Sequence, residues 1–238
     1  MSDRTGEWFV PSFGPSRFRS FMGLLFLPYT GMVLAYTIIG SMLAPDIHWD
    51  RVLAIVLIYF FALGIGAHAL DALGSKALKP WGEVFSRPLL WLLASSSLLL
   101  AYGIGIYYML RYTPALWIVA LLEGFFVFAY NLEWFAGRFH TDGWFAFSWG
   151  ALPVLAGYIL QTNSVSSAAI LLAVSAGLLS RVEISASRPY KALIRAAPDK
   201  PGADNTQVLI QSFERVLRNL SAGVIVLGLG LLVWRWHG

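Results

Sequence analysis

Ionisable side chains inside or beside long apolar runs are the residues of this sequence best placed to do chemistry. The set is small: His68, Asp71, Glu123, Glu133, Arg181 and Glu183, with His140 shortly after. Such a group is costly in a bilayer, and it usually faces a partner, a substrate or a water-filled cavity. Because the sequence has no cysteine, a metal bound here would need imidazole nitrogen or oxygen ligands.

Two spacings along the chain place these groups on common helix faces. His68 and Asp71 are three residues apart in GAHALDAL, so they share a face if the segment is helical. Glu133 and His140 would share a face if their helix ran on through Gly137. Imidazoles with carboxylates suit Zn, Mn or Fe, whereas carboxylates alone suit Mg held through phosphate oxygens. The candidate ligands of a divalent metal are His68, Asp71, Glu133, His140 and Glu183.

Structural explanations compete with these roles, because residues at span ends can simply lie at the membrane interface. His140 lies near Arg138 and Asp142 and could belong to an ordinary solvated loop. Glu123 could be an acid hydrogen-bonded to a neighbouring helix. For His68 and Asp71 a function is favoured, because an Asp beside an imidazole in a bilayer needs a compensating partner.

The elements that must position these groups are membrane-spanning helices. Only 13% of the 238 residues are charged and 58% are hydrophobic, whereas an ordinary soluble domain has about 25% charged residues. This composition argues against a soluble enzyme, a nucleic-acid-binding domain and a disordered chain. Apolar runs of about 20 residues, the length that crosses a bilayer, occur at 21–44, 52–73, 89–110, 115–135, 144–160, 165–180 and 220–236. The sequence predicts an all-α polytopic transmembrane helix bundle of about seven spans, with six to eight possible.

The cations predict the orientation of the bundle. With a cytoplasmic N-terminus, 14 of the 17 Lys and Arg residues fall on inner segments and 3 on outer ones, as the positive-inside rule requires. His68, Asp71, Glu133 and Glu183 then end spans at the cytoplasmic face, while Glu123 lies about 15 Å deeper than Glu133 by helix rise. We expect an integral protein of the cytoplasmic membrane of a prokaryote or of an organelle membrane.

The predicted domain organisation is a single transmembrane domain over 1–238. Residues 1–19 form a cytoplasmic N-terminal segment, and 181–218 form a cytoplasmic loop. The stretch 206–217 within this loop is amphipathic, so it either lies on the membrane surface or extends the last span inward.

Several segments carry a resemblance to a known family. PSRFRSFMGLLFLPYTGMVLAYTIIG forms the first span, and GIGAHALDALGSKALKPWGEVFSRPLLWLLA covers the end of the second span and a basic loop. FAYNLEWFAGRF and WGALPVLAGYILQT follow in the fourth and fifth spans. In this order they resemble the UbiA-type intramembrane prenyltransferase superfamily over about residues 15–190, although members of that family usually have nine helices.

The two aspartate-rich motifs of that family are each half present. Asn-x-x-x-Asp-x-x-x-Asp aligns with Ala67, Asp71 and Ser75, and Asp-x-x-x-Asp aligns with Glu183 and Ser187. In the family these acids hold Mg that bridges a prenyl diphosphate. The resemblance therefore implies catalytic roles for Asp71 and Glu183, and the residues that could replace the missing acids are His68, Glu133 and His140.

The implied activity is prenyl transfer from a polyprenyl diphosphate or related isoprenoid lipid at a cytoplasmic-side intramembrane site, with Mg as cofactor. Candidate substrate-binding residues are Lys76, Lys79, Tyr130, Asn131, Arg138, Arg188 and Lys191, of which the cations would contact phosphate. One alternative is a diverged His/carboxylate enzyme that uses Fe, Mn or Zn for other lipid chemistry. Another is a noncatalytic membrane subunit or small transporter. The expected partners are membrane lipid and a lipophilic substrate, and no nucleic acid.

Overall fold

The computed structural model describes residues 7–74, 84–196 and 204–238. Within these ranges the chain forms helices and no strand, which confirms the all-α prediction. The helices are α1 (Ser16–Leu24), α2 (Leu27–Met42), α3 (Trp49–Tyr59), η2 (Phe60–Ala67), α4 (His68–Gly74), α5 (Arg87–Arg111), α6 (Leu116–Asn131), η3 (Phe135–Gly137), α7 (Asp142–Phe145), η4 (Ala146–Ala151), α8 (Leu152–Thr162), α9 (Ser167–Ala196) and α10 (Asp204–His237).

The helical segments have the length and composition of membrane spans. Six are long and apolar enough to cross a membrane: Ser16–Met42, Trp49–Gly74, Arg87–Arg111, Asp142–Thr162, Ser167–Arg195 and Asn205–His237. The shorter apolar helix α6 has 16 residues and measures about 24 Å at 1.5 Å per residue. These helices confirm the prediction of a polytopic bundle of about seven helices.

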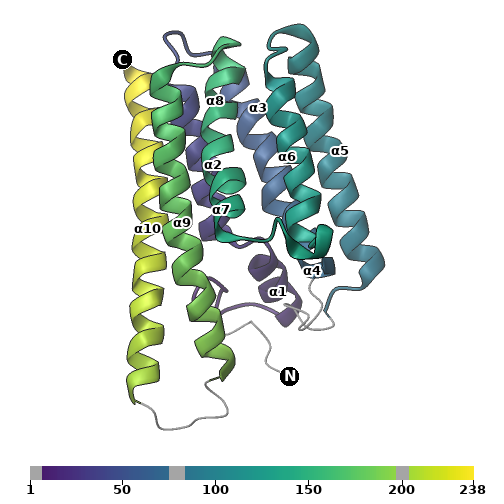
Figure 1. The fold of residues 1–238 in the computed structure, drawn as a ribbon, viewed down its shortest axis with the longest axis vertical. Coiled ribbons are helices and arrows are strands. Elements are labelled where there is room, and N and C mark those ends of the chain that lie inside the picture. The colour runs from purple at the N-terminus through teal and green to yellow at the C-terminus, as the bar shows by residue number, and fades with distance from the viewer. Residues whose placement is uncertain (1–6, 75–83, 197–203) are drawn as a thin grey trace.

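The helices run side by side, with α9 and α10 along one edge and α5 and α6 along the other (Figure 1). The C-terminus and the turns after α2, α5 and α8 lie at one end, which we call the C-terminal end. Helices α1 and α4 lie at the opposite, N-terminal end, and α9 and α10 extend past them. With 30 and 34 residues, these two helices exceed the roughly 20 residues that a bilayer requires.

Helix α2 packs between α8 and α10 at the centre of the bundle. A methyl group added to Gly40 would meet the carbonyl of Val154, and one added to Gly157 would meet the carbonyl of Thr37. The Ser41 hydroxyl also lies 3.3 Å from the Gly157 carbonyl oxygen. The two glycines therefore let the α2 and α8 backbones touch, as small residues commonly do between membrane helices.

Two spans contain π-helical turns. In the fifth span, Pro153 has no N–H to donate to the carbonyl four residues earlier, and η4 lies immediately before this turn. Such local widening is one way membrane helices accommodate proline. In the second span, η2 ends directly before His68. π-Turns occur often at functional sites, and both lie next to the polar residues considered below.

The prediction of a cytoplasmic loop over 181–218 is wrong. Helix α9 continues through Pro189 to Ala196, and α10 begins at Asp204. The two helices pack against each other, and tertiary packing of this kind stabilises helices. The amphipathic stretch 206–217 thus extends the last span, the second of its two predicted arrangements. At the other terminus, α1 begins at Ser16, inside the expected N-terminal segment 1–19.

Candidate functional site

Helix α4 carries both His68 and Asp71, so they share a helix as the spacing predicted, and α4 lies at the N-terminal end of the bundle. The His68 ring stacks on Phe26, with centroids 5.0 Å apart and planes at 23°. Phe26 lies at the break between α1 and α2, where its φ of 44° interrupts the helix. His68 Nε2 lies 3.4 Å from the Thr30 hydroxyl oxygen, while that hydroxyl donates to the Leu25 carbonyl at 2.7 Å. The contact therefore requires Nε2 to be the donor.

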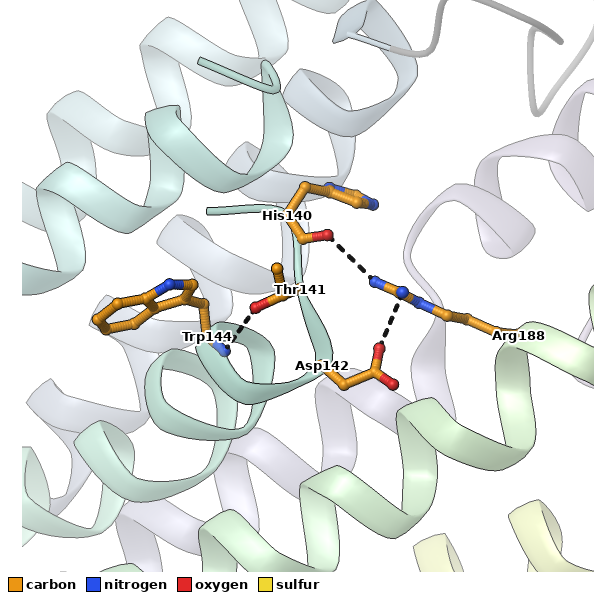
Figure 2. Close-up of polar contacts among 5 residues, drawn as sticks. All are labelled: His140, Thr141, Asp142, Trp144 and Arg188. Atoms are coloured by element: carbon orange, nitrogen blue, oxygen red, sulfur yellow. Dashed lines mark hydrogen bonds and ion pairs between the residues drawn. The ribbon is translucent and has the colours of Figure 1, made fainter. Parts of the chain in front are cut away.

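Arg188 of α9 reaches across to the segment that begins α7 (Figure 2). Its Nη1 lies 3.0 Å from Asp142 Oδ1, and its Nη2 donates to the His140 carbonyl at 3.3 Å. The Trp144 amide donates to the Thr141 hydroxyl at 3.4 Å, which caps the start of α7. Because the Arg188 and Asp142 side chains are 44% and 35% exposed, the ion pair is accessible to a charged ligand.

Tyr130, in the last turn of α6, joins this ion pair to α4. The His140 ring stacks on Tyr130 with centroids 4.4 Å apart, and Nδ1 donates to the Tyr130 carbonyl at 3.0 Å. The buried Tyr130 side chain also lies within electrostatic range of Arg188, Asp71 and Asp142. We call Asp71, Tyr130, His140, Asp142 and Arg188 the Tyr130 cluster.

A second group lies along α9 and contacts Phe26. Lys191 Nζ lies 5.2 Å from the centroid of the Phe26 ring, a cation–π contact. Lys191 also acts electrostatically on Glu183, which is 5% exposed. We call His68, Phe26, Lys191 and Glu183 the Phe26 cluster. Arg188 and Lys191 are three residues apart on α9, so the two clusters adjoin along one helix face.

Helix α6 ends before residue 135, where the sequence predicted the end of the fourth span. It stops at Asn131, and Glu133, Phe135 and Ala136 have left-handed φ values of 51°, 55° and 57°. The helix does not run on through Gly137, so the condition under which Glu133 and His140 would share a helix face is not met. The chain turns back instead and lays His140 against Tyr130.

The expected metal ligands do not gather around one point. Among the residues that the structure describes, no three His, Asp or Glu side chains are placed to hold a metal ion. His140 Nδ1, in the Tyr130 cluster, donates to a carbonyl. His68 Nε2 lies beside the Thr30 hydroxyl, and His68 and Glu183 belong to the Phe26 cluster. The described side chains thus form no three-ligand site on their own, and the metal cofactor stays a prediction.

The remaining substrate-binding candidates differ in their surroundings. The buried Asn131 amide donates to the Val127 carbonyl of its own helix at 2.8 Å. Its backbone carbonyl faces Gly74, which lets α4 pack against the end of α6. Arg138 is exposed on the loop after α6. Lys76 and Lys79 lie outside the described residues.

Sequence reasoning missed two contributors to these clusters. Asp142 follows Thr141 at a helix start, and a Thr–Asp pair of this kind is a recognisable N-cap signal. Phe26 lies in an unbroken apolar run, so no signal in the sequence marks it. Glu123 makes the expected hydrogen bond to a neighbouring helix, because the Tyr59 hydroxyl donates to its Oε1 at 2.8 Å.

This chain matches no protein-family model, no curated protein and no solved structure. The UbiA-type resemblance therefore stays a prediction based on the sequence segments. The function has to be argued from the chemistry of the two clusters.

Proposed function

We propose that this chain is a UbiA-like membrane enzyme that binds a prenyl diphosphate, or a related anionic isoprenoid lipid, and transfers its prenyl group. The observation that carries the proposal is the pair of cations on one face of α9. Arg188 lies within electrostatic range of Tyr130, and Lys191 lies over Phe26. A guanidinium and an ammonium beside each other suit a diphosphate, since Arg binds phosphate oxygens in pairs and Lys acts as a point charge.

The substrate phosphates would replace the present partners of Arg188. Its bonds to the Asp142 carboxylate and the His140 carbonyl are partly exposed, and exposed ion pairs contribute at most about 1 kcal/mol. A diphosphate with more than one negative charge can therefore compete for the guanidinium. Asp142 and the carbonyl keep Arg188 extended toward the site while no lipid is bound.

The proposed transfer breaks the bond between the prenyl C1 carbon and the diphosphate oxygen. The electron pair leaves with pyrophosphate, whose growing charge Arg188 and Lys191 would stabilise. An acceptor nucleophile then forms the new bond to C1 and releases a proton. Asp71, within electrostatic range of the Tyr130 hydroxyl, is the candidate base, and the Tyr130 and Phe26 rings can stabilise positive charge at C1 through their faces.

The test is binding of farnesyl and geranylgeranyl diphosphate to the full-length protein in nanodiscs, by calorimetry. The change Arg188→Gln should weaken binding about tenfold or more, because a hydrogen bond to a charged group contributes about 1.5–3 kcal/mol. The matched control is Arg195→Gln, on the same helix and exposed, which should leave the affinity unchanged.

Turnover is measured separately as pyrophosphate release with added Mg and a mixture of lipid acceptors. Binding of neither diphosphate by the wild-type protein would overturn the proposal. Equal weakening by Arg188→Gln and Arg195→Gln would also overturn it, because binding would then reflect only the overall charge of α9.

A further inference from the structure

A pocket lies among α3, η2, α5 and α6, away from the Tyr130 cluster. Its cavity volume is about 60 Å³, which has room for a few water-sized groups. Aliphatic side chains such as Ile55, Leu98 and Met109 make up most of its wall. The polar side chains of its lining are Tyr59, Tyr102 and Glu123. The pocket is therefore an apolar chamber with one polar corner.

The polar corner has an unused hydrogen-bonding position. The Tyr59 hydroxyl donates to Glu123 Oε1 at 2.8 Å. Glu123 Oε2 is shielded from solvent and has no hydrogen-bond partner among the described residues. The Tyr102 hydroxyl donates instead to the Ala120 carbonyl at 3.3 Å. A buried polar atom without a partner is costly, so a ligand that bonds to Oε2 would bind favourably here.

The neighbouring backbone is shaped to admit Tyr102 into this corner. A methyl group at Gly124 would meet the Tyr102 hydroxyl, so a side chain at this position would push the tyrosine away. Helices α5 and α6 lie at the edge of the bundle (Figure 1). Their outward faces carry exposed apolar residues, including Leu99, Leu110, Ile118 and Leu121. Membrane lipid would therefore surround the wall of this pocket.

The chemistry of the corner selects one class of ligand. A hydroxyl both donates and accepts a hydrogen bond, so it satisfies Oε2 whether or not the carboxyl carries a proton. A phosphate or carboxylate head group would instead bring negative charge against Glu123 in an apolar surrounding. The aliphatic wall suits a hydrocarbon chain.

We infer that this pocket binds the hydroxyl end of a membrane lipid alcohol, with its single hydroxyl on Glu123 Oε2, its first carbons against the aliphatic wall and the rest of its chain in the surrounding lipid. The site is separate from the proposed prenyl diphosphate site. Glu123 lies seven residues before Tyr130 on α6, about 10 Å along the helix axis.

The probe is tritiated hexadecanol, and its saturable binding to the purified full-length protein is measured by scintillation proximity. Unlabelled hexadecanol should compete at least about tenfold better than hexadecane, which has the same chain without the hydroxyl. Glu123→Leu should remove the saturable binding. Glu123→Gln should keep it, because the amide also offers a donor and an acceptor.

The matched control is Ser96→Leu, a polar-to-Leu change on exposed α5 surface where the hydroxyl bonds only within its own helix. It should bind hexadecanol as the wild type does. Equal competition by hexadecane and hexadecanol would overturn the inference, and so would undiminished binding by Glu123→Leu.

The wild-type competition and Glu123→Gln do not depend on whether Glu123→Leu folds, so they keep the inference testable. Farnesyl diphosphate binding, measured on the same samples, should be unaffected by Glu123→Leu. A failure at this site is thereby distinguished from a failure of the proposed function.

Discussion

At the scale of single residues, the return of the chain after α6 depends on unusual backbone conformations. Glu133, Phe135 and Ala136 have φ values of 51°, 55° and 57°, in the left-handed region that side chains disfavour by about 1–2 kcal/mol per residue. The segment after this turn is held by the stacking of His140 on Tyr130 and by the 3.0 Å hydrogen bond from His140 Nδ1 to the Tyr130 carbonyl. Strained residues of this kind often accompany functional sites, and these directly precede the Tyr130 cluster.

Relief of this strain is testable at Ala136. The change Ala136→Gly should raise the free energy of unfolding by about 1 kcal/mol, because glycine adopts φ 57°, ψ 33° without the steric cost of a Cβ. The measurement is thermal or denaturant unfolding of the purified protein in detergent. The control Ala222→Gly, at an exposed position within α10, should lower it by about 1 kcal/mol. Equal destabilisation by both changes would contradict the left-handed conformation at Ala136.

At the scale of the helices, close crossings position the side chains of the clusters. Gly74 allows α4 to meet the end of α6 at the Asn131 carbonyl, which brings Asp71 toward Tyr130. Gly150 allows η4 to approach the Ala176 carbonyl of α9, so that α7 and Arg188 face each other. The polar clusters therefore depend on where small residues let backbones touch.

The crossing of α2 and α8 provides a test at this scale. A Cβ at Gly157 would meet the backbone carbonyl of Thr37, which cannot move aside as a flexible side chain can. Gly157→Ala should therefore lower the free energy of unfolding by about 1–3 kcal/mol, the usual cost of overpacking. Gly103→Ala is the control, because no atom lies within 4 Å of its added methyl group and alanine favours the helix. Unchanged stability of Gly157→Ala in detergent would argue against this crossing.

At the scale of the whole molecule, the two ends of the bundle carry different charges. Arg188, Lys191 and Arg195 lie near the end of α9 that extends past α1, while the opposite end contains the turn after α8. The positive-inside rule assigns the cation-rich end to the cytoplasm. A prenyl diphosphate made in the cytoplasm would then reach the proposed site directly.

The orientation can be measured with single cysteines, since the sequence has none of its own. Ser164→Cys, in the turn between α8 and α9, should react with a membrane-impermeant maleimide added outside intact cells. Gln211→Cys, exposed near the start of α10, should react only after the membrane is opened. The reverse labelling pattern would show that the N-terminus faces outward.

Sequence reasoning reached some features of the site and missed others for identifiable reasons. The shared face of His68 and Asp71 depends on a three-residue spacing within one helix, which helical geometry sets locally. The hydrogen bond of Glu123 to a neighbouring helix followed from the cost of an acid in an apolar span. The end of α6 and the contact of His140 with Tyr130 were missed, because no residue type between Glu133 and Ala136 indicates a left-handed backbone conformation.

The sequence by itself determined the helical class, the approximate number of spans and the sorting of cations. A bilayer requires each spanning segment to be apolar and to satisfy its own backbone hydrogen bonds, so composition and run length suffice for these features. Only the tertiary structure decided which polar groups meet. Arg188 reaches the His140 carbonyl from 48 positions along the chain, and Lys191 lies over Phe26 of another span. Such contacts arise from helix crossings, which depend on packing between distant segments.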